Sequence, residues 1–382
     1  MEFQFSSDQL AIRDAVAKFL SEEWDLSERR RALDDGPVKV SDALWQQVVD
    51  MGWIGIAVSE DKGGSGLELL TSAMLVEEAA QVLFPSRLCS ALASAYALDQ
   101  CGGDSMPKLL GSHMTGQHFV SLAMDEANGD YGPENNSTRA TMSGDEGVIS
   151  GQKILVPDAD VADHFLVASR LGDKGVLIKV AADAPGLTIT PMERIDAQCV
   201  SELELKDVAF STEDILGDAD EAEAVLQRTY EFWTTLISAD LLGVTTTALQ
   251  MTNAYAKERH QFNRPIGSFQ AVSHRLADVK MDEEVGRSLL YGACLALQER
   301  PDESSPQVSA AKAWLSDAAT RATEAALQLH GGIGYTWELD VHLLLRQARS
   351  NAVYLGDADY HRKRIGAYLA EQLKSSAAGV SN

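Results

Sequence analysis

Cysteine is scarce in this 382-residue sequence, and its spacing forms no recognisable pattern. The four cysteines are Cys89, Cys101, Cys199 and Cys294, and no two of them are separated as in a Cys-x-x-Cys motif. This spacing argues against a zinc ribbon and a redox-active pair, and we expect no metal site. Free, mostly buried thiols in a reducing compartment are the expected state.

Basic residues are fewer than acidic ones, and long apolar runs are absent from the sequence. The chain has 32 Lys and Arg against 57 Asp and Glu, which gives a formal net charge of −25 and a pI near 4.6. Such a charge repels duplex nucleic acid and anionic bilayers, so neither is expected as a partner. No run approaches the roughly 18 apolar residues of a membrane span. The start, Met1–Phe5, lacks the basic and apolar regions of a signal peptide. We expect a soluble, cytoplasmic protein.

The first third of the chain has helical periodicity. A cap at Ser7 or Asp8 precedes an apolar stripe, and a second helix is expected over Ser41–Met51. A third, strongly periodic segment begins near Glu68. These patterns predict an N-terminal helical domain over residues 1–117.

The middle of the chain changes to short β-rich runs separated by Gly, Asp, Asn and Pro clusters. The runs are Phe119–Leu122, Gly147–Ile149, His164–Ala168, Val176–Val180, Leu187–Thr190 and Glu202–Leu205. They predict a β-barrel or sandwich domain over residues 118–221. Long segments rich in Ala, Leu and Glu follow and predict a helical domain over 222–382, so the expected fold class is α+β.

Residues 259–270 form the first constellation with chemical potential. They read Arg-His-Gln-Phe-Asn-Arg-Pro-Ile-Gly-Ser-Phe-Gln, and Pro and Gly interrupt a helix there. An Arg, an aromatic and a Gln are thus presented at one corner. Arg grips a phosphate with two N–H groups, and Phe262 is suited to cover an aromatic ring. A plain helix end with a solvated Arg is an equally good interpretation of these residues alone.

The second constellation is residues 328–338, where a helix stops at the paired glycines Gly331 and Gly332. Glycines allow another backbone or a phosphate to approach closely. Taken alone, this pattern favours an ordinary turn between helices with a glycine cap.

Together and in this order, the two constellations resemble the acyl-CoA dehydrogenase flavoprotein family. Other parts of the chain are similar to the family as well. These are the start at Phe5–Gln9, Gly52–Trp53, the loop Ser59–Gly66, Glu77–Glu78, Ala123–Glu126 and Gly151–Lys153. The resemblance covers nearly the whole chain. It implies an N-terminal helical domain, a middle β domain and a C-terminal four-helix bundle.

The resemblance also implies a reaction, a cofactor and an assembly. Members remove the α-proton of an acyl-CoA with a carboxylate base, pass the β-hydrogen to FAD as hydride, and deliver the electrons to an electron-transferring flavoprotein. Each FAD is shared between two subunits, so an oligomer is expected. One subunit supplies the flavin pocket and the base. Its neighbour supplies a set of residues that we call the clasp, which here is Arg259, Phe262, Gln270, Gln328, Gly331 and Gly332.

The positions that would carry the base depart from the family pattern. The usual Glu corresponds to Leu355, which cannot accept a proton. The alternative base position, on an earlier helix, corresponds to Trp233, and the adjacent family Arg corresponds to Thr234.

The flavin side departs too. The family Thr that bonds the flavin corresponds to Asp125, and the family Trp-x-Thr element is Leu155-Val156-Pro157 here. Pro157 lacks both a hydroxyl and an N–H donor. Asp357 would add negative charge near the cofactor.

The clasp residues are present, whereas the base and flavin positions depart from the family. Three hypotheses follow from this difference. The first is a base-less partner subunit of a heteromeric acyl-CoA dehydrogenase, similar to the two-subunit α2β2 enzymes of steroid side-chain degradation. The second is a self-sufficient homo-oligomeric enzyme with a relocated base. Asp357 is then the nearest candidate, although a solvated or helix-capping carboxylate is favoured, and Asp125 and Glu231 are others. The third is a non-catalytic scaffold that reuses the fold.

Overall fold

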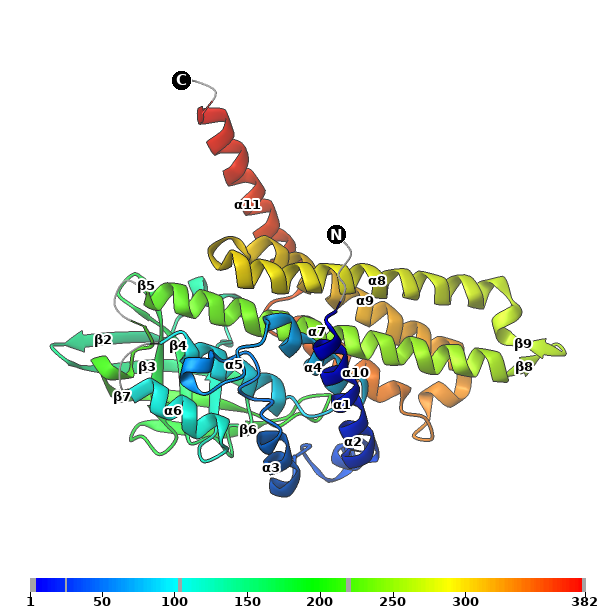
Figure 1. Ribbon diagram of the computed structural model, residues 1–382, viewed down its shortest axis with the longest axis horizontal. Coiled ribbons are helices and arrows are strands. Elements are labelled where there is room, and N and C mark those ends of the chain that lie inside the picture. The colour runs from blue at the N-terminus through cyan, green and yellow to red at the C-terminus, as the bar shows by residue number, and fades with distance from the viewer. Residues whose placement is uncertain (1–4, 25, 102–104, 218–220, 380–382) are drawn as a thin grey trace.

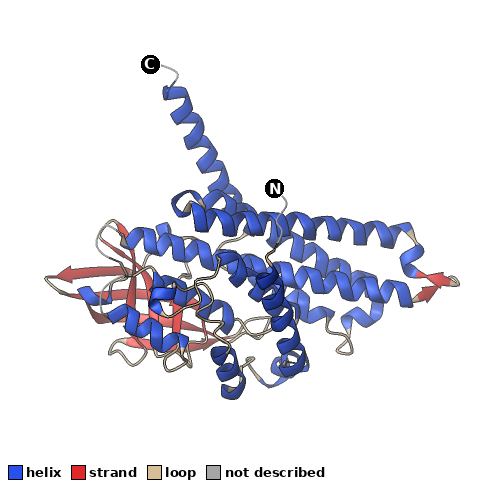
Figure 2. Cartoon of the chain, in the orientation of Figure 1, coloured by secondary structure: helices blue, strands red, loops and turns tan. Residues whose placement is uncertain are grey.

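The computed structural model describes residues 5–24, 26–101, 105–217 and 221–379. Helices come first, a β-sheet follows, and long helices complete the chain (Figures 1 and 2). The expected α+β organisation is confirmed. The change from helix to strand falls between Met114 and Val120, and helix returns at Ala222. The division into separate domains at these points stays a prediction.

The N-terminal part consists of helices that pack around a shared apolar core. They are α1 (Ser7–Glu23), α2 (Leu26–Asp35), α3 (Asp42–Asp50), α4 (Leu69–Gln81), α5 (Arg87–Asp99) and α6 (Ser105–Met114). Ser41, the first residue of the predicted second helix, is the N-cap of α3 and accepts from the Leu44 N–H. The cap of α1 is Ser6, one residue before the predicted pair, because Ser6 and Gln9 form a reciprocal capping box.

The middle of the chain forms one curled, mixed sheet. Among the described residues its strands are β1 (Val120–Ala123), β2 (Arg139–Ser143), β3 (Glu146–Pro157), β4 (His164–Leu171), β5 (Lys174–Ala181), β6 (Leu187–Met192) and β7 (Val200–Ser211). The order is β1-β4-β2-β3-β7-β6, with β5 paired to β4. Every predicted run falls in a strand except for Phe119, which lies just before β1. Strand β2 is not among the predicted runs, because the alternation of Ala140 and Met142 with polar residues is confined to five residues.

The C-terminal part is built on three long helices. They are α7 (Ala222–Glu258), α8 (Gln270–Glu299) and α9 (Ser305–His330), and α10 (Val341–Val353) packs against α7 and α9. The short hairpin of β8 (His260–Gln261) and β9 (Arg264–Pro265) joins α7 to α8. Helix α11 (Ala358–Gly379) begins against α9 and then projects from the body (Figure 1).

All four cysteines are free and buried, as the sequence predicts. No helix in the described ranges is long and apolar enough to cross a membrane. No group of His, Cys, Asp or Glu within these same ranges is arranged to hold a metal ion.

The contact between α4 and α7 is close enough to require glycine. A Cβ atom on Gly243 would lie 2.3 Å from the Glu77 carbonyl oxygen and 2.7 Å from the Ala80 Cβ. Both neighbours belong to a packed helix and cannot move aside independently. This contact fixes α7, which carries several residues of the candidate site, against the N-terminal helices.

We therefore predict opposite effects for two helical Gly→Ala changes. Gly243→Ala should lower the free energy of unfolding by about 2 kcal/mol or more, because the backbone overlap outweighs the roughly 1 kcal/mol helix-propensity gain. Gly292→Ala on α8 is the matched control, since nothing lies within 4 Å of its Cβ position. The control should be neutral or stabilising in urea unfolding. Equal stability of the two variants would contradict this close approach.

Candidate functional site

The two predicted constellations, residues 259–270 and 328–338, lie at the same end of the bundle. The first connects α7 to α8 through the β8–β9 hairpin, and the second covers the last residues of α9 and the turn after it. Tyr255 on α7 packs on His330 at the end of α9, with ring centroids 4.5 Å apart. This contact brings the two halves of the predicted clasp together.

The clasp is open to solvent in the isolated chain. Each of its six residues is exposed, and Phe262 is 86% exposed at a left-handed φ of 51°. Gly331 has a φ of 64°, and the Cβ positions of Gly331 and Gly332 face open space. The clasp therefore presents an exposed aromatic ring, an exposed guanidinium and an open backbone turn to the surroundings.

The clasp and the β-sheet lie at opposite ends of the molecule. The β8–β9 hairpin forms one tip of the long axis, while β1 to β7 occupy the other end (Figures 1 and 2). The clasp therefore cannot close over a ligand bound to the sheet of its own chain. A single ligand that contacts both a clasp and the β-sheet in this way would have to bridge two chains.

The predicted base positions lie in the packed interior. Leu355 is fully buried, and Trp233 is 1% exposed with its ring edge-on to Tyr354 at 5.4 Å between centroids. Thr234 is buried too, and its hydroxyl donates to the Tyr230 carbonyl one turn earlier on α7. No group at these positions is able to accept a proton from a substrate.

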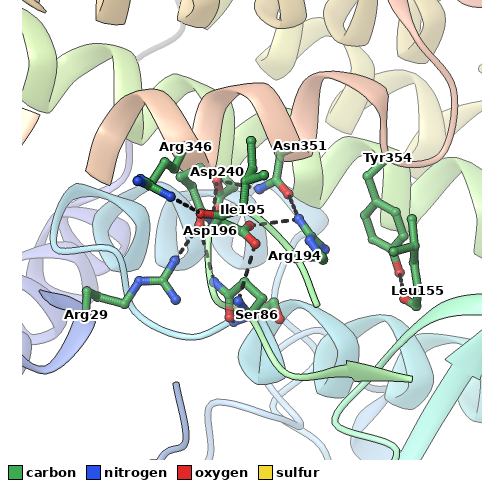
Figure 3. Close-up of polar contacts among 12 residues, drawn as sticks. Arg29, Ser86, Leu155, Arg194, Ile195, Asp196, Asp240, Arg346, Asn351 and Tyr354 are labelled. Carbon is green, nitrogen blue, oxygen red and sulfur yellow. Dashed lines mark hydrogen bonds and ion pairs between the residues drawn. The ribbon is translucent and has the colours of Figure 1, made fainter. Parts of the chain in front are cut away.

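Direct contacts close the crevice in which the resemblance places the flavin. The crevice segments are Asp125 after β1, residues 155–157 at the end of β3, and residues 354–357 between α10 and α11. The Leu355 N–H donates to Asp125 Oδ2 at 3.2 Å, and the Tyr354 hydroxyl donates to the Leu155 carbonyl at 3.2 Å. Figure 3 shows Tyr354 directed at Leu155. Protein thus bonds to protein across the crevice.

Further hydrogen bonds hold the Leu355 carbonyl. The Tyr230 hydroxyl donates to it from α7, and His361 Nε2 on α11 contacts it at 3.1 Å. Leu355 has a φ of 56°, a left-handed conformation that costs a non-glycine residue about 1 kcal/mol or more. Bonds from three elements stabilise this conformation and keep the leucine side chain buried.

Lys312 on α9 also holds the loop between α10 and α11 that contains Leu355. Its ammonium is fully buried and donates to the carbonyls of Asn351, Ala352 and Gly356 at 2.9–3.1 Å. These carbonyls belong to the C-terminal end of α10 and the turn after it, where a positive charge is favourable. Burial lowers the pKa of Lys312 to about 7, and the charges of Asp125 and Asp357 oppose this effect.

A second loop, between β1 and β2, closes the crevice on the side of the β-sheet. The segment after Glu126 is organised by Lys153, whose buried ammonium bonds Glu126 Oε1 at 2.7 Å and the Met124 carbonyl at 3.1 Å. At the far end of this segment, Glu134 accepts from the Tyr360 hydroxyl of α11 at 3.0 Å. A Cβ on Gly132 would lie 2.0 Å from that hydroxyl oxygen, so the segment lies directly against α11.

Each candidate for a relocated base is already engaged. Asp357 accepts from the Tyr360 N–H at 2.8 Å and thereby caps α11. Glu231 is 1% exposed, accepts from Gln227 and Ser304, and pairs with Arg364. Asp125 accepts from Leu355, as described above. These contacts favour structural roles for the three carboxylates.

Sequence reasoning missed the residues that hold the crevice shut, namely Tyr230, Lys312 and His361. Lys312 leaves a signal, because a single lysine in the run Ala310–Leu315 is otherwise surrounded by apolar residues. Tyr230 leaves none, since its partner is a backbone carbonyl 125 positions away. His361 is only six positions from the same carbonyl, but a histidine at this spacing carries no pattern that predicts the contact.

Comparison with known proteins decides the family. The family model "Acyl-CoA dehydrogenase, C-terminal domain" matches residues 225–370, and "Acyl-CoA dehydrogenase, N-terminal domain" matches residues 6–108. The chain belongs to the acyl-CoA dehydrogenase family. The probable acyl-CoA dehydrogenase YngJ of Bacillus subtilis is 30% identical over 390 residues, which cover 97% of this chain and 100% of YngJ.

Two solved structures of this family are closely similar in shape. A chain of the ChsE4–ChsE5 complex from Mycobacterium tuberculosis is 29% identical, with a TM-score of 0.87 over 97% of this chain and 99% of that one. A chain of a variant Tcur3481–Tcur3483 steroid ACAD is also 29% identical, with a TM-score of 0.88 over 96% and 99%. The acyl-CoA dehydrogenase fold expected from the sequence is confirmed.

FAD is the cofactor of this family, as the sequence predicts. The cofactor site of this acyl-CoA dehydrogenase chain has two halves, the clasp and the crevice, and only the clasp fits FAD. The clasp fits, because an exposed Arg259, an exposed Phe262 and an open glycine turn suit a pyrophosphate and an aromatic base. The crevice does not fit, because Asp125, at the position of the family Thr that bonds the flavin, accepts from the Leu355 N–H of its own chain instead.

The ionisation of Asp125 gives a test of the closed crevice. Burial raises the pKa of this carboxyl from 3.8 to about 6, while the Leu355 N–H and the nearby lysines lower it. The folded chain therefore binds the proton more tightly than the unfolded chain. Stability contributed by this group is lost as the pH rises from about 4 to about 6.

We predict that Asp125→Asn stabilises the chain more at about pH 7.5 than at about pH 5, by about 1 kcal/mol. The asparagine carbonyl still accepts from Leu355 and carries no charge to desolvate. Urea unfolding of both proteins at the two pH values measures the difference. A variant that is destabilised equally at both values would show that Asp125 is not enclosed in the chain.

The capping role of Asp357 gives a second test. Asp357→Ala should lower stability by about 1 kcal/mol, because it removes the acceptor for the Tyr360 N–H. Asp357→Asn should stay within a few tenths of a kcal/mol of the parent, because asparagine also caps helices well. Thermal unfolding of the two variants measures this contrast. Equal losses would argue against a cap.

Proposed function

We propose that this chain is the base-less partner subunit of a heteromeric, FAD-dependent acyl-CoA dehydrogenase. Its clasp binds the FAD of a related subunit that carries the carboxylate base. The assembly removes hydrogen from the α and β carbons of an acyl-CoA thioester. Electron-transferring flavoprotein is the proposed acceptor of the electrons, and the proposed location is the cytoplasm.

One observation carries this proposal. The crevice is shut by the hydrogen bond between Asp125 and Leu355, while the clasp is exposed at the opposite end of the chain. A self-sufficient subunit needs both halves of the site in working form. This chain keeps only the half that serves a neighbour. Two of the similar structures, ChsE4–ChsE5 and Tcur3481–Tcur3483, are named for two different chains, which supports a heteromer.

The residues of the clasp have distinct roles in this proposal. Arg259 pairs with the FAD pyrophosphate through two N–H groups, and Phe262 covers the aromatic adenine ring. Gln270 and Gln328 supply amide groups, and the turn at Gly331 and Gly332 lets the chain approach closely. When bound, FAD supplies the hydride acceptor for the reaction.

The α-proton has to be taken by the partner subunit. Leu355 and Trp233 have no basic atom, and the carboxylates of Asp357 and Glu231 are engaged within the fold. The partner also has to supply the donors that stabilise the enolate at the thioester oxygen. A steroid-derived acyl group is the proposed substrate class, since one similar structure is described as a steroid ACAD.

We predict that the chain expressed alone carries far less than one FAD per chain. Co-expression with a base-bearing family member from the same genome should restore FAD to about half the total chain count, as expected when one of two sites is closed. Protein-bound flavin, released and quantified against chain concentration, measures both values. Full occupancy of the isolated chain would contradict the proposal and favour a self-sufficient enzyme. A chain that neither binds FAD nor captures a base-bearing relative would favour the scaffold hypothesis.

Variants of the clasp test its role within the complex. Arg259→Gln should weaken FAD binding roughly tenfold or more, because a charge-assisted contact with the pyrophosphate is worth about 1.5–3 kcal/mol. Phe262→Ala should also weaken it, without affecting the stability of the isolated chain, because the ring is almost fully exposed. Arg300→Gln is the control, since this exposed arginine follows α8 at the other end of that helix. Retention of FAD equal to the control would rule out the clasp.

A further inference from the structure

Helix α11 projects from the body of the chain and exposes apolar side chains (Figure 1). It packs against α9 near its start, where the His361 ring contacts the Ser309 hydroxyl at 3.3 Å. Further along, Leu369 is 55% exposed and Leu373, one turn later, is 73% exposed. The two leucines therefore lie outside the core of their own chain.

These leucines belong to a stripe along one side of α11, which we call the α11 stripe. Intervals of three and four residues place its members on one face of the helix, and they are Ile365, Tyr368, Leu369 and Leu373. Most helix stability in proteins comes from the packing of such a face. The α11 stripe lacks this packing where its leucines are exposed, so we expect another molecule to cover it.

Helix α8 carries a second uncovered apolar stripe, which we call the α8 stripe. Met281 is 61% exposed and Val285 is 40% exposed. Ala277 and Ser288 are exposed at the same helical spacing, so the four residues share one face. Other sides of α8 pack against α4, α7 and α9. The α8 stripe is therefore a face of the bundle that the described residues leave open.

Helix α9 contacts both α8 and α11 close to these stripes. Its Trp314 donates to the Asp282 carbonyl, next to Met281 on α8. Its Asp317, three residues further along, pairs with Arg362 near the start of α11. From there α11 projects away from the bundle, so its stripe does not lie on α8 of its own chain (Figure 1). A contact between the two stripes therefore requires a second chain.

Charge favours α8 over a second α11 as the surface that covers the α11 stripe. Among charged residues without an ion pair in the described ranges, α11 has one more base than acid, and α8 has one more acid than base. They are Lys363, Lys374 and Glu371 on α11, and Asp278, Glu299 and Arg275 on α8. Two α11 helices side by side would bring like net charge together, whereas α11 against α8 joins opposite charge.

The size of the contact favours a second copy of this chain as the partner. A single contact between two stripes of four residues is small against the roughly 1,000 Å² expected of a biological interface. With two-fold symmetry, α11 of each copy covers α8 of the other, and the contact is made twice. A partner that lacks these stripes can offer no such doubling.

We propose that α11 docks on the α8 stripe of a second copy of this chain, in a reciprocal two-fold dimer. Leu369 and Leu373 of each copy cover Met281 and Val285 of the other. Neither stripe contains a clasp residue, so the dimer contact and the binding of FAD use different side chains. The proposal does not depend on the partner-subunit function.

Sedimentation of the purified chain over a range of concentrations tests the dimer. The salt is kept at about 0.15 M, where the repulsion between the acidic copies is screened beyond about 8 Å. We expect reversible dimers with a dissociation constant of roughly micromolar order, since the interface is small. A monomeric parent chain would overturn the proposal, including the case in which α11 contacts only a base-bearing partner.

Matched variants test the two stripes. Leu369→Gln combined with Leu373→Gln should raise the dissociation constant of the dimer about tenfold or more, because the burial of leucine is lost while helix propensity is kept. Met281→Gln on α8 should also raise it. Leu10→Gln on α1 is the control, since Leu10 is 37% exposed and lies outside both stripes. Equal dissociation constants for the α11 variant and this control would overturn the proposal.

Cysteine cross-linking tests which helices meet. Chains with Leu369→Cys or Leu373→Cys, mixed with chains that carry Met281→Cys, should form disulfides between unlike variants, since the native cysteines are buried. Disulfides only between like α11 variants would show that α11 pairs with α11 and would overturn the assignment to α8. Phe262→Ala should leave the dimer intact. Loss of the dimer in Phe262→Ala alone would assign self-association to the clasp and contradict the proposal.

Discussion

The backbone of Leu355 is held in a left-handed turn by hydrogen bonds from three separate elements, and the arrangement of the whole site depends on this turn. Asp125 accepts its N–H from the end of β1, while Tyr230 and His361 bind its carbonyl from α7 and α11. With the backbone fixed in this way, the leucine side chain fills the interior. A charged glutamate at this buried position would meet a large desolvation cost. The absent base and the closed crevice therefore share one local structure.

The clasp and the crevice are the two halves of one cofactor site in the family, and in this chain only the clasp is open. The clasp stays exposed at the tip formed by β8 and β9, at the far end from the β-sheet. Two residues of the C-terminal helices reinforce the closed state. Lys312 donates to the Gly356 carbonyl, and the Tyr360 hydroxyl donates to Glu134. The bundle therefore has two functions in one chain: it presents the clasp at one end and shuts the crevice at the other. This division matches a subunit that completes the site of a neighbour.

The sequence predicts those parts of the structure that depend on local patterns. The helix break within residues 259–270, the glycine turn after α9 and the helix that begins near Ser41 follow from short-range residue preferences, and the structure confirms them. Helix α7 ends at Glu258, before Pro265 and Gly267. Strand β2 was missed because its apolar residues, Ala140 and Met142, form too short a pattern to distinguish a strand from a loop. The bond between Asp125 and Leu355 joins residues that are 230 positions apart, and no periodicity encodes such a pair. Sequence comparison with the family indicated that the base was absent but gave no indication that the crevice was closed.

The position of FAD in the assembled complex tests this account most directly. Electron cryo-microscopy of the chain bound to its base-bearing partner would locate the cofactor against both subunits. The account predicts FAD between Arg259 and Phe262 of this chain and the β domain of the partner, with the Asp125–Leu355 bond of this chain intact. FAD inserted between Asp125 and Leu355 of this chain would contradict it.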